Sequence, residues 1–200
     1  MRSAPGALVL LAFVSLGPVA AHGATLVNPG FETGDLTGWD TFLRNGTAAV
    51  VADLDGYHPP MGGHFLAVGG GAANSQQYVW QGVNLTKGDV LKGWAALDHA
   101  ATDVSFSDWA AAEVFNSGLD TLVAPIWRSP SSPSAGWEKW TWNVPYTGYF
   151  YIAFSSSTDA ATYSRSLGLF DVRDTPNPEP GTVALMLLGL PVAALLRRRR

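Results

Sequence analysis

The sequence predicts an all-β sandwich. Short stretches in which apolar and polar residues alternate recur along residues 25–174, and Gly, Pro, Asn or Asp separate them. The chain has 22 Gly and 13 Pro, so turns are frequent, and no stretch has a convincing amphipathic helical pattern. The 8 Trp and 9 Phe supply apolar area for a core between two sheets. We therefore expect a single domain of short strands in two layers.

Four strands can be placed around two turns. Residues 76–85 alternate up to the turn "TKGD", and residues 90–97 follow it as the next strand. Residues 137–144 and 149–154 flank the turn "PYTG" and are expected to pair as a β-hairpin. The large apolar residues fall on one face of each of these two strands: Trp140, Trp142 and Val144 in the first, and Phe150, Ile152 and Phe154 in the second.

Other segments are less regular. Residues 107–115, "SDWAAAEVF", fit either a helical turn or a strand with small residues. Residues 129–136, "SPSSPSAG", are too rich in Pro and Ser for a strand and are expected to form an exposed loop. Residues 175–180 are expected to be a linker that follows the domain.

The N-terminus has the three-part pattern of a secretion signal. A basic residue, Arg2, precedes an apolar run over residues 7–16, and small residues follow. We expect residues 1–21 to be removed by cleavage after Ala21. Cleavage after Ala24 is the alternative, but it places His22 where a small residue is preferred. An uncleaved anchor helix is less favoured, because the apolar run is too short to span a membrane.

The C-terminus predicts a membrane anchor. Residues 181–196 carry no charge and would span roughly 24 Å as a helix. This is shorter than the usual span of about 20 residues, and the segment contains Pro191. The Arg run at residues 197–200 is expected to stay in the cytoplasm, which leaves residues 22–180 outside the cytoplasmic membrane. The alternative is a buried C-terminal helix with a basic tail.

The C-terminal pattern resembles the PEP-CTERM sorting signal. The resemblance covers about 24 residues and has the motif, the short apolar helix and the basic cluster in order at the terminus: Pro178, Glu179, Pro180, then Arg197, Arg198, Arg199 and Arg200. It implies an exosortase, a membrane protease-transpeptidase, as the partner. It also implies an exported protein that is held transiently in the membrane and then sorted to the surface or matrix of an exopolysaccharide-producing Gram-negative bacterium.

The middle of the chain resembles galactose-binding-like jelly rolls, which include several carbohydrate-binding modules. Residues 26–39, "LVNPGFETGDLTGW", resemble the first strand and loop of that fold. Residues 103–109, the expected hairpin and residues 167–172, "LGLFDV", resemble later landmarks in the same order. The resemblance implies a jelly-roll sandwich over residues 25–174 that associates with glycans such as exopolysaccharide.

The jelly-roll resemblance also implies a structural calcium. In that family an acidic residue after the first strand and an Asp near the last strand help to hold the ion, and these match Glu32 and Asp171. The alternative is that both carboxylates cap loops by accepting backbone hydrogen bonds. Asp53 and Asp55 form only a fragment of a calcium loop and are expected to lie in an ordinary turn. The four His residues have no zinc-ligand spacing.

Exposed aromatic residues are the candidate ligand-binding groups. A ring can stack on the apolar face of a sugar beside polar groups that fix its orientation. Trp109, Trp127 and Trp137 adjoin loop signals, and some of them are expected to be exposed. Tyr149 and Tyr151, on the outer face of their strand, are a further candidate platform. The other five Trp lie in strand contexts and are expected in the core: Trp39, Trp80, Trp94, Trp140 and Trp142.

Charge and motifs argue against several functions. Arg2 and the terminal Arg run hold 5 of the 12 basic residues, so the stretch between them carries 7 basic and all 16 acidic residues. An acidic domain does not attract nucleic acid. No nucleophile elbow, P-loop or dinucleotide fingerprint is present. Asp98, Asp103 and Asp108 are the carboxylates that could form the catalytic pair of a glycoside hydrolase. Nothing in the sequence fixes the distance between them, so we expect no catalytic residues.

Overall fold

The computed structural model describes residues 26–70, 74–99, 108–129, 135–158 and 166–175. Within these ranges every regular element is a strand, so the prediction of an all-β sandwich is confirmed for them. The strands are β1 (Asp40–Phe42), β2 (Thr47–Val51), β3 (Phe65–Gly69), β4 (Ser75–Leu85), β5 (Val90–His99), β6 (Trp109–Phe115), β7 (Leu122–Arg128), β8 (Ala135–Asn143), β9 (Gly148–Thr158) and β10 (Ser166–Thr175).

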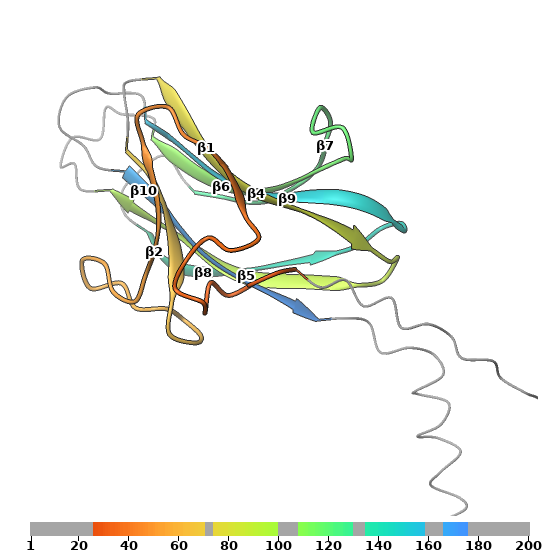
Figure 1. The fold of residues 1–200 in the computed structure, drawn as a ribbon, viewed down its shortest axis with the longest axis horizontal. Helices are drawn as coiled ribbons and strands as arrows, with labels where there is room; N and C mark the ends of the chain where they lie inside the picture. The colour runs from red at the N-terminus through yellow and green to blue at the C-terminus, as the bar shows by residue number, and fades with distance from the viewer. Residues whose placement is uncertain (1–25, 71–73, 100–107, 130–134, 159–165, 176–200) are drawn as a thin grey trace, which may run out of the picture. The chain divides into compact units, whose positions relative to one another are not determined.

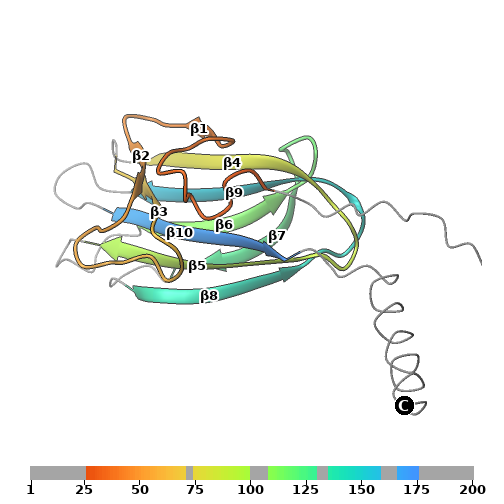
Figure 2. The same ribbon diagram turned by 60° about the horizontal axis from the view of Figure 1, so that its bottom comes forward.

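The strands form two sheets of five (Figures 1 and 2). Sheet A has the order β1-β4-β9-β6-β7, and sheet B has the order β2-β3-β10-β5-β8. Neighbouring strands are antiparallel throughout the described residues. The chain changes sheet at every connection except β2–β3 and β6–β7. This repeated wrapping between two layers is the arrangement that jelly rolls use.

The predicted hairpin over residues 137–154 is wrong. The two strands exist, but β8 pairs with β5 in sheet B and β9 pairs with β4 and β6 in sheet A. A hairpin would put both apolar faces on the same side of one sheet. By crossing between sheets, the chain makes the two faces meet across the core, where the rings of Trp142 and Phe150 are 5.5 Å apart. The burial of both faces therefore outweighs the local turn signal.

The irregular segments are also settled where they are described. Residues 109–115 form β6, so the strand alternative for this stretch is confirmed. The resemblance placed a first strand within residues 26–39, but these residues form successive turns, and the first strand begins at Asp40. Both ends of the expected exposed loop over residues 129–136 differ from the prediction: Ser129 is buried against the backbone of Ala110, and Ala135 already belongs to β8. Residues 130–134 lie outside the described residues.

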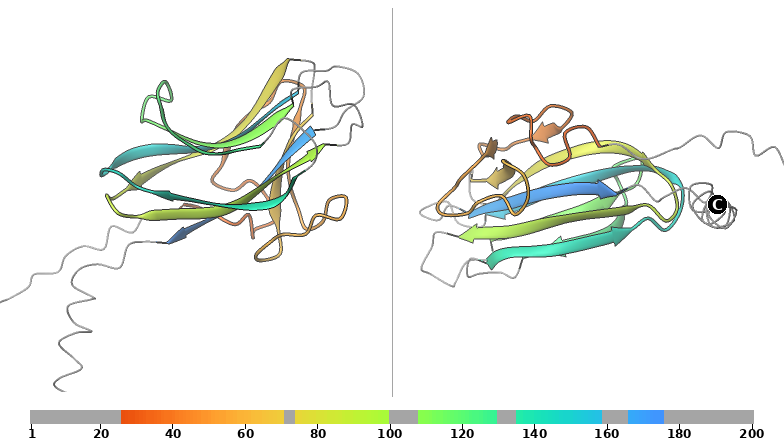
Figure 3. Two further views of the ribbon diagram at one scale, coloured as in Figure 1. Left: turned by 180° about the vertical axis from the view of Figure 1, so that it is seen from behind. Right: turned by 90° about the horizontal axis from the view of Figure 1, so that it is seen from below.

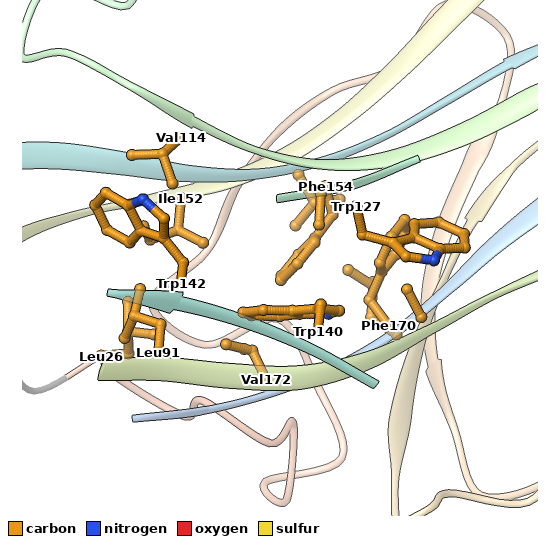
Figure 4. Packing of buried hydrophobic residues seen from close by; sticks show 14 of the residues in the cluster. Leu26, Leu91, Val114, Trp127, Trp140, Trp142, Ile152, Phe154, Phe170 and Val172 are labelled. Atoms are coloured by element: carbon orange, nitrogen blue, oxygen red, sulfur yellow. The ribbon is translucent and has the colours of Figure 1, made fainter. Parts of the chain in front are cut away.

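An aromatic cluster fills the space between the sheets (Figure 4). The rings of Phe154 from sheet A and Phe170 from sheet B stack with centroids 4.6 Å apart. Trp39 lies 5.5 Å from Phe154, and Phe31 packs beside both rings. Three Trp that the sequence assigned to the core are indeed buried: Trp39, Trp140 and Trp142. The other two are half-buried on the outer faces of β4 and β5: Trp80 and Trp94.

Two buried glutamines on the inner face of β4 hold the N-terminal segment. Gln81 accepts a hydrogen bond from the Val27 amide (2.6 Å) and donates to the carbonyls of Val27 (3.0 Å) and Gly38 (2.7 Å). Gln77 does the same for Arg44, accepting from its amide (2.6 Å) and donating to its carbonyl (3.2 Å). A primary amide presents the same donor and acceptor as a strand backbone, so these side chains take the place of strand pairing.

Both terminal predictions lie outside the described residues. They comprise the signal peptide (1–21), the part of the linker after Thr175, the apolar segment (181–196) and the Arg run (197–200). In the described ranges no helix has the length and apolar character that a membrane span requires.

Candidate functional site

The outer face of sheet A carries aromatic side chains in the middle of a strand. Along β4 the buried inward positions include Gln77 and Gln81, whereas Tyr78 and Trp80 point outward and are half-buried. On the neighbouring edge strand, Phe42 pairs with Tyr78 and is 48% exposed. In an ordinary strand with one buried face, the aromatic residues point into the core and the polar residues point outward. On β4 the aromatic residues Tyr78 and Trp80 instead point outward.

The strands beside β4 supply a floor of small residues. Ala153 of β9 lies opposite Trp80, and Ser155 lies opposite Tyr78. On β6, Ala111 continues the row of Ser155. Small side chains flanked by large rings leave a depression in the sheet surface.

The depression forms two adjoining cavities. The first is an apolar cavity of about 240 Å³ lined by Phe42, Tyr78, Trp80, Phe115, Leu119 and Ala153. The second is a polar cavity of about 420 Å³ lined by Phe42, Arg44, Asn74, Gln76, Tyr78 and Ser157. Because Phe42 and Tyr78 line both, the two cavities adjoin each other along β4, and we call the pair the outer groove.

A fixed loop forms one wall of the apolar cavity. Residues 116–121 connect β6 to β7 and project from sheet A (Figure 3). The side-chain oxygen of Asn116 accepts hydrogen bonds from the amides of Gly118, Asp120 and Thr121. Leu119 has φ of 58° and remains 42% exposed. The loop therefore holds an apolar side chain at the cavity rim, where a ligand can contact it.

Glu113 is the carboxylate beside the floor of the groove. It lies opposite Ala153, and its Oε2 accepts a hydrogen bond from the Ser155 hydroxyl at 3.5 Å. Burial raises the pKa of Glu113, while the charge of Arg128 and the Ser155 bond oppose this shift. Burial, followed by the charge of Glu113, raises the pKa of Tyr78, so that its phenol stays protonated at neutral pH.

Aromatic residues continue at both ends of this face. At one end, the guanidinium of Arg128 lies 4.1 Å from the ring centroid of Trp109, which pairs with Ser157 of the polar cavity. At the other end, Tyr149 and Tyr151 meet edge to face with centroids 5.3 Å apart. Tyr149 lies directly over Gly82, where any Cβ would overlap the phenol. The outer-face position predicted for these two tyrosines is confirmed.

The three Trp that the sequence singled out are not brought together. Trp109 lies on the outer face of sheet A. Trp127 is buried at the edge of the sandwich, where it meets Phe170 edge to face and donates to Glu138 Oε2 at 2.6 Å. Its burial removes Trp127 from any exposed platform.

Trp137 lies on the outer face of sheet B beneath another segment. Residues 52–64, which connect β2 to β3, pack against it there. Its Nε1 donates to the carbonyl of His58 at 2.8 Å, and its ring meets Phe65 and Tyr57 edge to face. Trp137 therefore holds this connection in place, and its ring is half-buried.

The predicted calcium ligands are described only in part. Glu32 is exposed, and its Oε2 accepts a hydrogen bond from the Gly63 amide at 2.9 Å, with His64 Nδ1 3.9 Å away. The backbone of Asp171 lies in β10 opposite Trp94, but its side chain is outside the described residues. Nowhere in the described ranges do three acidic or His side chains gather as metal ligands. The Gly63 bond agrees with the alternative in which Glu32 caps a loop.

The remaining polar candidates do not form a pair in the outer groove. Asp98 is buried on β5 of sheet B, Asp108 is buried just before β6 of sheet A, and Asp103 lies outside the described residues. Asp55 lies in the turn that the Leu54–Tyr57 bridge closes, as expected, and Asp53, which precedes this turn, has its Oδ2 2.9 Å from His58 Nδ1.

The residues at the centre of the groove were not predicted from the sequence. Trp80 was assigned to the core because it lies in a strand, and neither Tyr78 nor Phe42 was singled out. The usable signal was the pair Gln77 and Gln81 at inward positions of the same strand. Two side-chain amides four residues apart on a strand point to the same face, and they can be buried only if they form hydrogen bonds with backbone groups. The aromatic residues at the alternate positions between them then lie on the outer face.

No protein-family model matches the chain, and no curated protein matches it in sequence. Among solved structures, the enzymatically active domain of bacteriophage CBA120 tailspike protein 4 has a TM-score of 0.50 at 10% identity, over 78% of this chain and 22% of that one. This likeness shows a shared fold. It does not show a shared activity.

Two smaller proteins match at slightly lower TM-scores. TmCBM61, solved in complex with β-1,4-galactotriose, has a TM-score of 0.48 at 18% identity, over 75% of this chain and 96% of that one. The K1 cleaved adhesin domain of Lys-gingipain from Porphyromonas gingivalis has 0.49 at 17% identity, over 74% and 96%.

Proposed function

We propose that this chain is an exported, non-catalytic glycan-binding protein whose ligand lies in the outer groove of sheet A. The carrying observation is the apolar cavity around Tyr78 and Trp80, open to solvent in the middle of a sheet and adjoining a polar cavity. Sugars present apolar C–H faces and rings of hydroxyls, so a glycan needs both kinds of surface side by side.

The geometry supports binding of an extended chain. Trp80 and Tyr78 occupy successive outward positions of β4, which places them about 7 Å apart along the strand. Glu113, half-buried on β6 opposite Ala153 of the floor, can accept a hydrogen bond from a sugar hydroxyl. The small side chain of Ala153, which lines the apolar cavity, leaves room for a pyranose ring.

The proposed location rests on the two ends of the sequence. The signal at residues 1–21 exports the chain, and the apolar segment over residues 181–196 with the Arg run retains it in the membrane. The Pro178-Glu179-Pro180 motif is then the recognition site of an exosortase, which passes the sandwich to the surface polysaccharide. Alanine at all three motif positions should leave the protein in the membrane fraction of an exosortase-producing host, where the parent chain is released.

A structural surface protein is the second candidate. Exposed aromatic residues also favour protein association, and Phe42 and Leu119 are both more than 40% exposed. Such a protein would self-associate through sheet A without affinity for glycans. A glycoside hydrolase is less well supported, because Asp98 and Asp108 lie outside the groove and Asp103 is not described.

The test compares two Trp substitutions in the full chain, purified in a detergent without a sugar headgroup. Trp80→Ala removes the ring from the outer groove, and Trp94→Ala removes a similarly half-buried ring from the outer face of sheet B. Binding to the exopolysaccharide of the producing organism, and to a panel of plant and bacterial polysaccharides, is measured by affinity electrophoresis and calorimetry.

We expect Trp80→Ala to weaken binding by about tenfold or more, equivalent to ~1.4 kcal/mol, and Trp94→Ala to leave it unchanged. Near-ultraviolet circular dichroism verifies that both variants are folded. If the parent chain binds no polysaccharide and self-associates through sheet A, the structural candidate replaces the glycan-binding one. Equal loss in both variants would place the ligand elsewhere.

A further inference from the structure

Arg44 brings an uncompensated positive charge to the polar end of the outer groove. Its side chain lines the polar cavity and lies with its guanidinium carbon 5.6 Å from the centroid of Phe42. No described carboxylate lies within ion-pair distance of Arg44. Arg44 thus places a positive charge on the wall of a cavity, in a domain with more than twice as many acidic as basic residues.

The other described cations near an aromatic ring differ from Arg44. Arg128 lies on the ring of Trp109, and its charge acts on Glu113, which compensates it. Lys139 lies 5.6 Å from the ring centroid of Trp94 on the opposite sheet, away from either cavity.

The backbone that carries Arg44 is fixed by the core. Gln77, fully buried, bonds both the amide and the carbonyl of Arg44. The side-chain amide nitrogen of Gln77 also donates to the carbonyl of Gly70 and to the hydroxyl of Ser75, so the position of the Gln77 side chain is set on several sides. The base of the Arg44 side chain is therefore placed before any ligand arrives, which lowers the entropic cost of binding.

The other polar groups that line this cavity are uncharged and can donate hydrogen bonds. The Tyr78 hydroxyl donates to Gln76 Oε1 at 2.6 Å, so the oxygen of the Gln76 amide is already engaged and its two N–H groups are its donors. Asn74 and Ser157 add an amide and a hydroxyl. A guanidinium surrounded by neutral donors suits a ligand that brings negative charge and several acceptor oxygens.

We infer that the polar cavity binds an anionic substituent of the same glycan whose neutral ring stacks on Trp80, so that the preferred ligand is an acidic polysaccharide. The inference rests on the proposed function. Arg44 pairs with the anion, Gln76 and Asn74 donate to its oxygens, and the shared wall of Phe42 and Tyr78 separates the charged group from the stacked ring. Hexuronate carboxylates and sulfate esters share this chemistry.

The test uses polymer pairs that share a backbone and differ in whether the acidic group is charged or has been esterified or reduced. They are polygalacturonate with methyl-esterified pectin, alginate with its propylene glycol ester, and glucuronoxylan with its carboxyl-reduced form, and a sulfated galactan is included to distinguish sulfate from carboxylate. The full chain and three variants are compared: Arg44→Gln, Lys139→Gln as the matched loss of charge on the opposite sheet, and Trp80→Ala. Arg44→Gln retains the backbone bonds to Gln77, so its melting temperature should be unchanged.

We expect a charged member to bind at least tenfold more tightly than its neutral partner, with an advantage that falls as NaCl is raised. Arg44→Gln should abolish that advantage, Lys139→Gln should preserve it, and Trp80→Ala should weaken both members of the pair. Equal binding of charged and neutral members overturns the inference and leaves the proposed function standing. If the chain binds no polymer, both the inference and the proposed function are overturned. If the advantage of the charged polymer survives Arg44→Gln, only the inference is overturned.

Discussion

The side chain of Gln81 makes three hydrogen bonds to a segment that has no strand partner there. Because the residue is 5% exposed, water cannot replace these bonds. Gln81→Ala should therefore lower the free energy of unfolding by about 1–3 kcal/mol. Urea unfolding of the full chain measures this, and Gln76→Ala on the exposed face of the same strand is the control. A change below ~0.5 kcal/mol would show that the turns are held by other contacts.

Glu113 makes stability depend on pH in the direction opposite to a salt-bridged carboxylate. Burial raises its pKa in the folded state above the value in the unfolded chain. Between these two values the folded state binds more protons, so the free energy of unfolding falls as the pH rises through this window. Glu113→Gln should flatten the fall that begins above the ordinary pKa of a Glu side chain, about 4, measured by urea unfolding at a series of pH values. A steeper fall in the variant would contradict the assignment.

At the scale of elements, strand positions followed from the sequence far better than strand pairing. Alternation around Val79 and Phe150 identifies β4 and β9 correctly, because it reports local exposure. Pairing depends on where the opposite apolar face lies, and a short turn such as residues 145–147 can close a hairpin or cross between sheets equally well. The crossing is stabilised by backbone bonds between Val144 and the neighbouring turn at Gly88 and Asp89, which no local pattern reveals.

The connection over residues 52–64 is held on sheet B by one aromatic residue. Trp137→Ala removes the ring contacts with Phe65 and Tyr57 and the hydrogen bond to His58. It should destabilise the fold by roughly 2 kcal/mol and speed proteolysis within residues 52–64, while glycan affinity stays unchanged. Limited proteolysis followed by mass spectrometry locates the cuts. Lost glycan binding in a folded Trp137→Ala variant would move the ligand to sheet B.

For the whole molecule, a structural calcium at Glu32 and Asp171 stays a prediction. If the ion is bound, removing it with a chelator should lower the melting temperature of the full chain, and adding calcium should restore it. Glu32→Gln should then abolish the response. If Glu32 instead caps the Gly63 amide, chelator should have no effect, and Glu32→Gln should cost less than ~1 kcal/mol, since the glutamine oxygen still accepts that bond.

The sequence predicted which type of residue forms the candidate site, but not where on the sandwich the site lies. Composition indicated aromatic residues as the binding groups, and Trp109 does lie on the face that carries the groove. Trp127 was misjudged because its nearness to a Pro- and Ser-rich loop says nothing of the bond to Glu138 across the sandwich edge. The groove itself depends on small residues such as Ala153 lying opposite Trp80, a relation between strands more than 70 residues apart in sequence.

The place of β10 in the middle of sheet B bears on how the chain folds (Figure 3). Until residues 166–175 are available, β2–β3 and β5–β8 remain two separate strand pairs. The latest strand to be synthesised thus completes the sheet, and pairings between distant segments form slowly. A protease that cuts beyond Thr175 releases an intact sandwich. One that cuts before Ser166 leaves β3 and β5 with open edges, and such edges pair with other chains and aggregate.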